Sequence, residues 1–111
     1  MDLVGRILLA AFFAAGAVQK ALAPEVVEGL LAGVGAPGWL VWPALGVNVG
    51  LAVGLLLPRT VWLAALAAAS YCAMTSLFHL QPQDGWQMSI FVKNWAIAGG
   101  LLGLAAAHRP R

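Results

Sequence analysis

Residues 60–80 read TVWLAALAAASYCAMTSLFHL, and this stretch decides the class of fold. It contains no proline and no Asp, Glu, Lys or Arg, and His79 stands near its end. A helix that spans a bilayer needs about 20 predominantly apolar residues. The stretch is therefore predicted to cross a membrane as a helix.

The rest of the chain has the same character: of its 111 residues, 62% are hydrophobic and 9% are charged. Soluble domains are about 25% charged, so this composition excludes a free-standing soluble globule. The formal net charge of +2 provides no basic patch for nucleic acid. Cys72 is the single cysteine, which excludes an intrachain disulfide and a thiolate metal site. We expect no metal ion.

Three further apolar stretches have the length of a span, and the sequence predicts an all-α, antiparallel four-helix membrane bundle that forms one domain over residues 1–111. The four predicted spans cover residues 3–22, 39–57, 60–80 and 90–107. Residues 23–38 are expected to face water, with a short helix beginning at Pro24. The first stretch also resembles a signal peptide that ends in Ala21-Leu22-Ala23, but Lys20 and Pro24 flank that site unfavourably, and we expect a retained helix.

The basic residues predict the orientation of these spans. The excess of arginine on one side predicts that both termini lie in the cytoplasm. That side holds Arg6, Arg59, Arg109 and Arg111, and the other holds Lys20 and Lys93 with Glu25, Glu28 and Asp84. Four tryptophans are expected at the outer interface: Trp39, Trp42, Trp86 and Trp95. Arg6 and Lys20 stand near the two ends of the first span, from which both side chains can snorkel to the headgroups.

Polar side chains within the spans gather in the outer half of the membrane. Polar groups in hydrocarbon usually face the bundle interior or a wet cavity, so these residues are predicted to form one outward-facing cationic pocket. Its candidate ligand-binding residues are Lys20, Asn48, Thr75, Ser76, His79, Lys93, Asn94 and Trp95. Cys72, Thr75, Ser76 and His79 are three or four residues apart and share one helical face. No residue is singled out as catalytic.

Each of these features also has a purely structural interpretation. Lys20 and Lys93 can serve as interfacial anchors, and Thr75 and Ser76 can bond to carbonyls of their own helix. Small residues four apart favour close helix packing, within the bundle or at a dimer seam. These small residues are Gly46, Gly50 and Gly54 in the second span and Gly99 and Gly103 in the fourth.

The order of these features resembles the DoxX family of small four-helix membrane proteins. The resemblance rests on these pieces of sequence: Arg6-Ile7-Leu8-Leu9, Phe12-Phe13, Ala15-Gly16, Lys20, Phe78-His79, Phe91-Val92-Lys93-Asn94 and Gly99-Gly100. It implies an integral cytoplasmic-membrane protein, associated in some members with quinone-linked sulfur oxidation or with thiol and oxidative-stress systems. The family often has a glutamate where this chain has Asn48, which forms hydrogen bonds but does not titrate.

Together, these observations favour an accessory membrane subunit of a quinone- or thiol-linked redox system. Its pocket would take a quinone head group or small anion, with quinone as the candidate cofactor and a redox protein as partner. An autonomous enzyme is not favoured, because the spans hold no Ser-His-Asp set. The alternatives are a small-solute transporter or channel acting as a homo-oligomer, and a membrane anchor or assembly factor whose outer loops, residues 25–38 and 81–89, recruit a partner.

Overall fold

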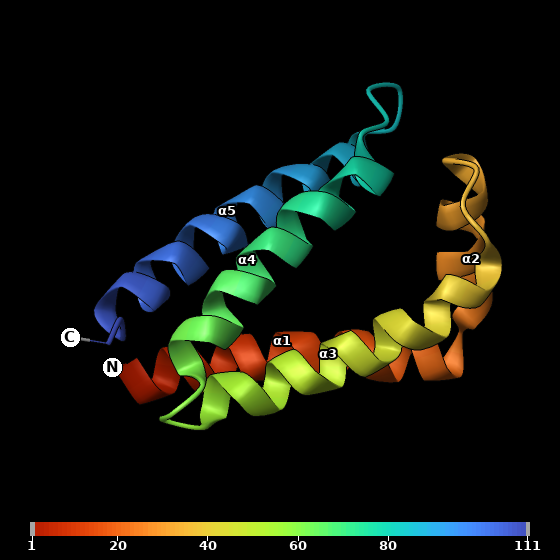
Figure 1. The fold of residues 1–111 in the computed structure, drawn as a ribbon. Coiled ribbons are helices and arrows are strands. Elements are labelled where there is room, and N and C mark those ends of the chain that lie inside the picture. Colours follow the sequence, from red (N-terminus) through yellow and green to blue (C-terminus); the bar gives the residue numbers. More distant parts are fainter. Residues whose placement is uncertain (1, 111) are drawn as a thin grey trace. The chain divides into compact units, whose positions relative to one another are not determined.

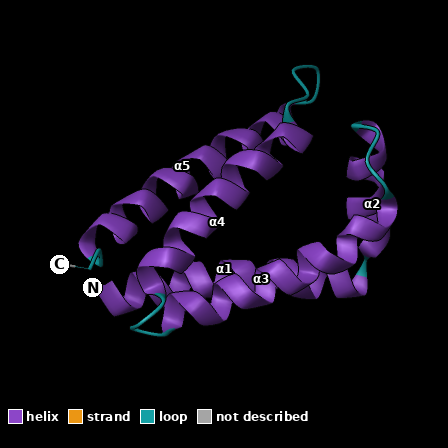
Figure 2. Cartoon of the chain, in the orientation of Figure 1, coloured by secondary structure: helices purple, strands orange, loops and turns teal. Residues whose placement is uncertain are grey.

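The computed structural model describes residues 2–110, and helices form nearly all of this part of the chain (Figure 1, Figure 2). The elements in chain order are α1 (Asp2–Leu22), α2 (Pro24–Gly33), the 3₁₀ helix η1 (Gly38–Leu40), α3 (Val41–Leu56), α4 (Val61–Ser76), the 3₁₀ helix η2 (Leu77–His79) and α5 (Gly85–Ala107). The predicted all-α class is confirmed.

Four helical segments are long and apolar enough to cross a membrane, as expected for a four-helix membrane protein. They are Asp2–Leu22, Gly38–Leu56, Val61–His79 and Gly85–Ala107. The short helix α2 lies between the first two segments and begins at Pro24, as predicted. Proline fits the first turn of a helix because the N–H that it lacks has no partner there anyway.

The start of α5 differs from the sequence prediction, because the helix begins at Gly85 rather than near residue 90. The Asp84 carboxylate is the cause. Its oxygen accepts hydrogen bonds from the backbone N–H groups of Trp86 at 3.0 Å and Gln87 at 3.3 Å. An aspartate in this position satisfies N–H groups that have no partner in the first turn, so the helix extends into a stretch whose polarity suggested a loop.

The chain divides into two compact units, residues 1–60 and 61–111, and each is described by itself. In the first unit α1 packs along α3 (Figure 1). The two helices are antiparallel, since Arg6 bonds to Leu55 while Phe13 bonds to Asn48 further back along α3. The buried apolar side chains of this helix pair are Ala10, Phe13 and Ala17 on α1 and Val41, Leu51, Ala52 and Leu55 on α3.

In the second unit α4 packs along α5, and η2 with residues 80–84 connects them (Figure 1). Small side chains dominate the buried positions of this pair. They are Ala64, Ala65, Ala68, Ala69 and Cys72 on α4 and Ala98 and Ala105 on α5. Short side chains let two helix backbones approach closely, which is a common way to associate helices in a membrane.

Four of the five glycines that are spaced four apart make no close contact within their helix pairs. A Cβ atom added at Gly46, Gly50, Gly99 or Gly103 would meet no atom within 4 Å. Close helix contact at these four glycines is therefore not seen within either helix pair. A Cβ atom added at Gly16 on α1, by contrast, would lie 2.5 Å from Asn48 Nδ2.

Candidate functional site

Arg6 is the most deeply placed charged side chain that the structure describes, with 7% of its surface exposed. Its Nε donates to the Leu55 carbonyl oxygen at 2.8 Å, and its Nη2 donates to the Leu56 carbonyl oxygen at 2.9 Å. Snorkelling to the headgroups, which the sequence allows for Arg6, is therefore not what the structure shows. The arginine instead fastens α1 to the last turn of α3.

The end of α3 explains this placement. The last carbonyls of a helix have no partner within it, and a positive charge at a helix C-terminus is favourable. The backbone turns extended at Leu57, and Pro58 follows without an N–H to offer. Side chains donate to these carbonyls instead. Arg6 donates to two of them, and Thr60 Oγ1 donates to the Gly54 oxygen at 2.9 Å.

Lys20 and Asn48, two of the predicted site residues, lie together in the first helix pair. The Lys20 ammonium donates to Asn48 Oδ1 at 3.1 Å, and Asn48 Nδ2 donates to the Phe13 carbonyl oxygen at 2.9 Å. Asn48 is buried and Lys20 is half-buried. The Asn48 amide therefore connects α3 to α1 and presents its oxygen to the lysine.

Gly16 makes this arrangement possible. A Cβ atom at position 16 would lie 2.5 Å from Asn48 Nδ2, a separation that real Cβ atoms essentially never show. The missing side chain leaves the space that the Asn48 amide occupies. Sequence reasoning did not assign this role to Gly16, although Gly16 precedes Lys20 by one helical turn and so shares its face.

The Lys20–Asn48 cluster carries a positive charge. The described residues place no carboxylate within ion-pair distance of the Lys20 ammonium, whose hydrogen-bond partner is a neutral amide. Arg6 differs in this respect, because its Nη1 lies 3.5 Å from the Asp2 carboxylate. An ammonium has three N–H donors, so Lys20 retains donors for the oxygen atoms of a ligand.

The predicted site residues of α4 and η2 mostly bond within their own segment. Thr75 Oγ1 donates to the Tyr71 carbonyl at 2.8 Å, and Ser76 Oγ donates to the Ala73 carbonyl at 2.6 Å. Both hydroxyls therefore bond to carbonyls of their own helix, which is the structural role considered above. His79 Nδ1 lies 2.6 Å from Gln87 Oε1, and because an amide oxygen only accepts, Nδ1 carries the proton in this bond. The bond joins η2 to the first turns of α5.

Lys93, Asn94 and Trp95 are consecutive, so their side chains leave α5 in different directions, about 100° apart. Asn94 is buried, whereas Lys93 and Trp95 are exposed. The Trp95 ring makes an edge-to-face contact with Phe91 at a centroid distance of 6.3 Å. Lys93 borders a shallow, open hollow of about 480 Å³ on α5.

The structure thus brings together Lys20 and Asn48, and separately His79 with Gln87, a partner that sequence reasoning did not single out. One pocket shared by all the predicted residues stays a prediction. Within residues 2–110, no group of three or more His, Cys, Asp or Glu side chains is arranged to hold a metal ion.

Four apolar membrane-spanning helices and a cationic polar cluster between α1 and α3 define a multi-pass α-helical membrane protein. The DoxX family model matches residues 1–81, and the chain belongs to the DoxX family. The match includes the first-span residues and Phe78-His79 on which the resemblance was based, and it ends before the last span. Comparisons with curated proteins and with solved structures give no match.

Proposed function

We propose that this DoxX-family protein is an accessory membrane subunit of a quinone- or thiol-linked redox system and holds a quinone head group or small anion at Lys20 and Asn48. In this proposal the protein lies in the inner membrane with both termini in the cytoplasm, and a partner protein supplies the electrons. One observation carries the proposal: the half-buried Lys20 ammonium lies in a membrane-spanning helix and bonds to a neutral amide.

A charged side chain in a membrane span is costly, and such residues usually have a partner or line a wet cavity. Arg6 illustrates the first case, since two carbonyls and the Asp2 carboxylate surround its guanidinium. Lys20 has the Asn48 oxygen alone among the described residues. A ligand oxygen, in a carbonyl or an anion, would satisfy the remaining ammonium donors and offset the positive charge.

The donor set fits a quinone head group. A quinone supplies two-electron redox chemistry when bound, and its ring carries carbonyl oxygens that accept hydrogen bonds. Lys20 would donate to one such oxygen and favour negative charge on it. Asn48 would hold the ammonium in place, because the bond from Nδ2 to the Phe13 carbonyl fixes the direction of Oδ1.

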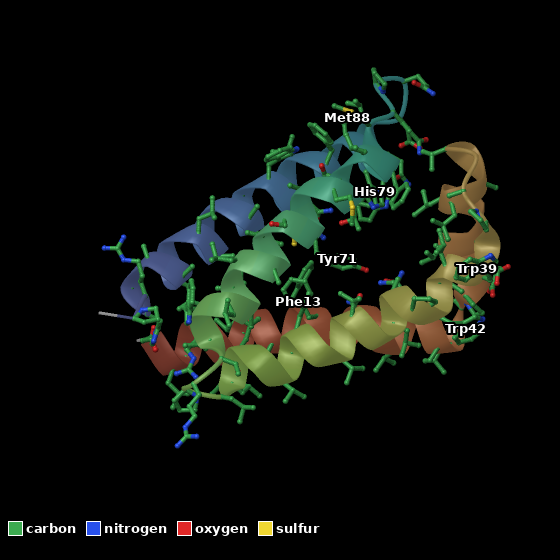
Figure 3. The ribbon with its side chains drawn as sticks, in the orientation of Figure 1. Phe13, Trp39, Trp42, Tyr71, His79 and Met88 are labelled. Carbon is green, nitrogen blue, oxygen red and sulfur yellow. The ribbon has the colours of Figure 1, made fainter. Side chains whose placement is uncertain are left out.

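Binding of a short-chain quinone analogue to the purified protein in lipid nanodiscs tests the proposal. Tryptophan fluorescence is suited to the measurement, because Trp39 in η1 and Trp42 in the first turn of α3 belong to the same helix pair as Lys20 and Asn48 (Figure 3). We expect saturable quenching of the unmodified protein and affinity at least about ten-fold lower in Lys20→Met, a loss of about 1.4 kcal/mol. Arg59→Gln is the matched control, since it removes an exposed positive charge in the turn between α3 and α4.

Quenching that does not saturate, or that is equal in Lys20→Met and Arg59→Gln, would contradict the proposal. Circular dichroism of each variant must show unchanged helix content. A saturable response to a small anion such as sulfate, with no response to the quinone analogue, would identify an anion as the ligand. Flux of that anion into proteoliposomes would then assign transport in place of an accessory redox role.

A further inference from the structure

Lys20 carries a positive charge at the end of α1, and no carboxylate among residues 2–60 pairs with it. Asp2 stands in the first turn of α1 and Lys20 in the last, about 27 Å apart at 1.5 Å per residue. Glu25 and Glu28 lie on α2 and are exposed, and neither forms an ion pair with Lys20. The hydrogen-bond partner of Lys20 is the neutral Asn48 amide, at 3.1 Å.

The second helix pair has no carboxylate within its spans to offer either. Residues 61–111 contain one Asp or Glu side chain, Asp84, which precedes the span of α5. Its Oδ1 accepts the hydrogen bonds from Trp86 and Gln87 that begin this helix. This conclusion follows from the sequence and does not depend on where the second pair lies. No Asp or Glu of either pair therefore offsets the charge of Lys20 within the spans.

The Asn48 amide occupies the place where a countercharge to Lys20 would stand. The Phe13 carbonyl only accepts hydrogen bonds and the Lys20 ammonium only donates them, so Asn48 Nδ2 faces Phe13 and Oδ1 faces Lys20. The missing side chain at Gly16 leaves the space for this amide. Aspartate has nearly the same shape as asparagine and would bring a negative charge to the lysine. The cluster therefore keeps its net positive charge because residue 48 is an amide.

A ligand with a negative charge gains more at this cluster than a neutral ligand of the same shape. After the bond to Asn48, the Lys20 ammonium has N–H donors left for a carbonyl oxygen or for an anionic oxygen. Attraction between two unit charges adds to the hydrogen bond in the second case only. An anionic oxygen also offsets the cost of a single charge in a membrane span, which a neutral oxygen does not.

We propose that the Lys20–Asn48 cluster selects an oxyanion and binds it more tightly than a neutral molecule of the same shape. The inference rests on the proposed function and narrows its ligand, because a quinone would then bind in an ionised form, such as that of a hydroxyquinone. An inorganic anion is the second source of a negatively charged oxygen. Asn48 is a positioning residue in this selection, since its amide holds the ammonium without neutralising it.

Two quinones of matched shape and different charge test the inference. 2-Hydroxy-3-methyl-1,4-naphthoquinone is an acid that is ionised at neutral pH, and 2,3-dimethyl-1,4-naphthoquinone replaces its hydroxyl with a methyl group. Tryptophan fluorescence measures binding of each to the full-length protein in phosphatidylcholine nanodiscs, and empty nanodiscs correct for partition into lipid and for scaffold fluorescence. We expect the ionised quinone to bind at least about ten-fold more tightly, which corresponds to about 1.4 kcal/mol.

Lys20→Gln removes the charge of the cluster and keeps an N–H donor for Asn48 Oδ1. Affinity for the ionised quinone should fall at least about ten-fold, and affinity for the neutral quinone should change less than about three-fold, since only the first depends on charge attraction. Arg59→Gln is the matched control, because it changes the net charge of the protein by the same amount in the exposed turn between α3 and α4. It should keep the preference for the ionised quinone.

Asn48→Asp is an independent variant, because it brings a negative charge to the cluster and leaves Lys20 in place. It should abolish the preference for the ionised quinone. The variant also turns an oxygen toward the Phe13 carbonyl, so its helix content is compared with that of the unmodified protein by circular dichroism. If the helix content falls, Lys20→Gln alone decides.

The outcomes separate this inference from the proposed function. Equal affinity for the two quinones, with both weakened in Lys20→Gln, would overturn the charge selection and leave binding at Lys20 in place. Binding of neither quinone, together with a saturable response to sulfate that Lys20→Gln abolishes, would support the charge selection and remove the quinone from the proposed function. Equal affinities of Lys20→Gln and Arg59→Gln for every probe would overturn both.

Discussion

The two helix pairs are held together by different kinds of contact. In the α1–α3 pair, the Arg6 guanidinium and the Asn48 amide reach across and bond to the backbone of the opposite helix. In the α4–α5 pair, alanines fill the buried positions, and the hydroxyls of Thr75 and Ser76 bond within their own helix. The His79–Gln87 bond is confined to the end where the two helices are connected.

This difference shows two solutions to one problem. Lipid tails are as apolar as leucine, so burying apolar side chains between helices gains little in a membrane. Association must come from hydrogen bonds that lipid cannot offer or from close packing of small residues. The α1–α3 pair therefore depends on particular hydrogen-bond donors, and the α4–α5 pair depends on small side chains at its buried positions.

Replacing Arg6 with leucine should have the largest effect on stability. The change leaves the Leu55 and Leu56 carbonyls without their donors. We expect the free energy of unfolding to fall by about 2–4 kcal/mol, since unsatisfied buried polar groups cost about 1–3 kcal/mol each. Unfolding in mixed detergent micelles by titration with dodecyl sulfate measures this change. Asp2→Asn removes the half-exposed ion pair with Arg6 and leaves the bonds from Arg6 to α3 in place, so it should cost less than about 0.5 kcal/mol. Equal losses in the two variants would show that charge, rather than the bonds to α3, matters.

Enlarging a buried alanine is the corresponding test of the second pair. Ala68 is fully buried, and Ala68→Leu should lower the free energy of unfolding by about 1–3 kcal/mol through overpacking. Ala67→Leu makes the same change at the neighbouring exposed position and should be close to neutral. The same dodecyl sulfate titration compares the variants. A stable Ala68→Leu protein would show that α4 does not rely on small residues.

The substitution Gly16→Ala should have a smaller effect, because a gain in helix propensity opposes the clash with Asn48. We expect a net loss of about 1 kcal/mol, the difference between about 2 kcal/mol of overpacking and about 1 kcal/mol of propensity. Gly50→Ala is the control, since a Cβ atom there would meet nothing within 4 Å. Thermal unfolding in detergent distinguishes the two, and Gly50→Ala should be neutral or stabilising. Equal behaviour would mean that the Asn48 amide moves freely out of the way.

The smallest effect is expected for Thr75→Val, which keeps the shape of the side chain and removes its hydroxyl. The hydroxyl donates to the Tyr71 carbonyl of its own helix, where the backbone already forms a hydrogen bond. The loss should be less than about 0.5 kcal/mol, as for other such local bonds. The comparison with Asn48→Ala is informative, because that variant removes bonds between α1 and α3. If the two variants lose equal stability, the distinction between local and interhelical bonds fails.

Most of the fold could be predicted from the sequence, because long apolar stretches bounded by Pro58-Arg59 and by polar loops leave few arrangements in a membrane. The start of α5 could not be placed well. Polar residues at 81–89 suggested a loop, but Asp84 caps the helix and α5 begins at Gly85. A capping aspartate six residues before the predicted span was a usable signal.

The site could be predicted only in part. Lys20 and Asn48, two of the eight residues expected in one pocket, bond to each other, but the role of Gly16 depends on a distance that no sequence pattern gives. Arg6 was expected to snorkel because a charge near the end of a span usually can. What hydropathy could not show is that α3 ends beside Arg6 with carbonyls that need donors.

The bonds from Arg6 also impose an order on assembly. Arg6 and Leu55 are 49 positions apart, and α1 is synthesised long before the last turn of α3 exists. During that interval the guanidinium has no backbone partner on α3. Once α3 has been made, the guanidinium bonds to its last turn and joins α1 to α3. The bonds between α1 and the end of α3 therefore form only after the whole of the second span has been synthesised.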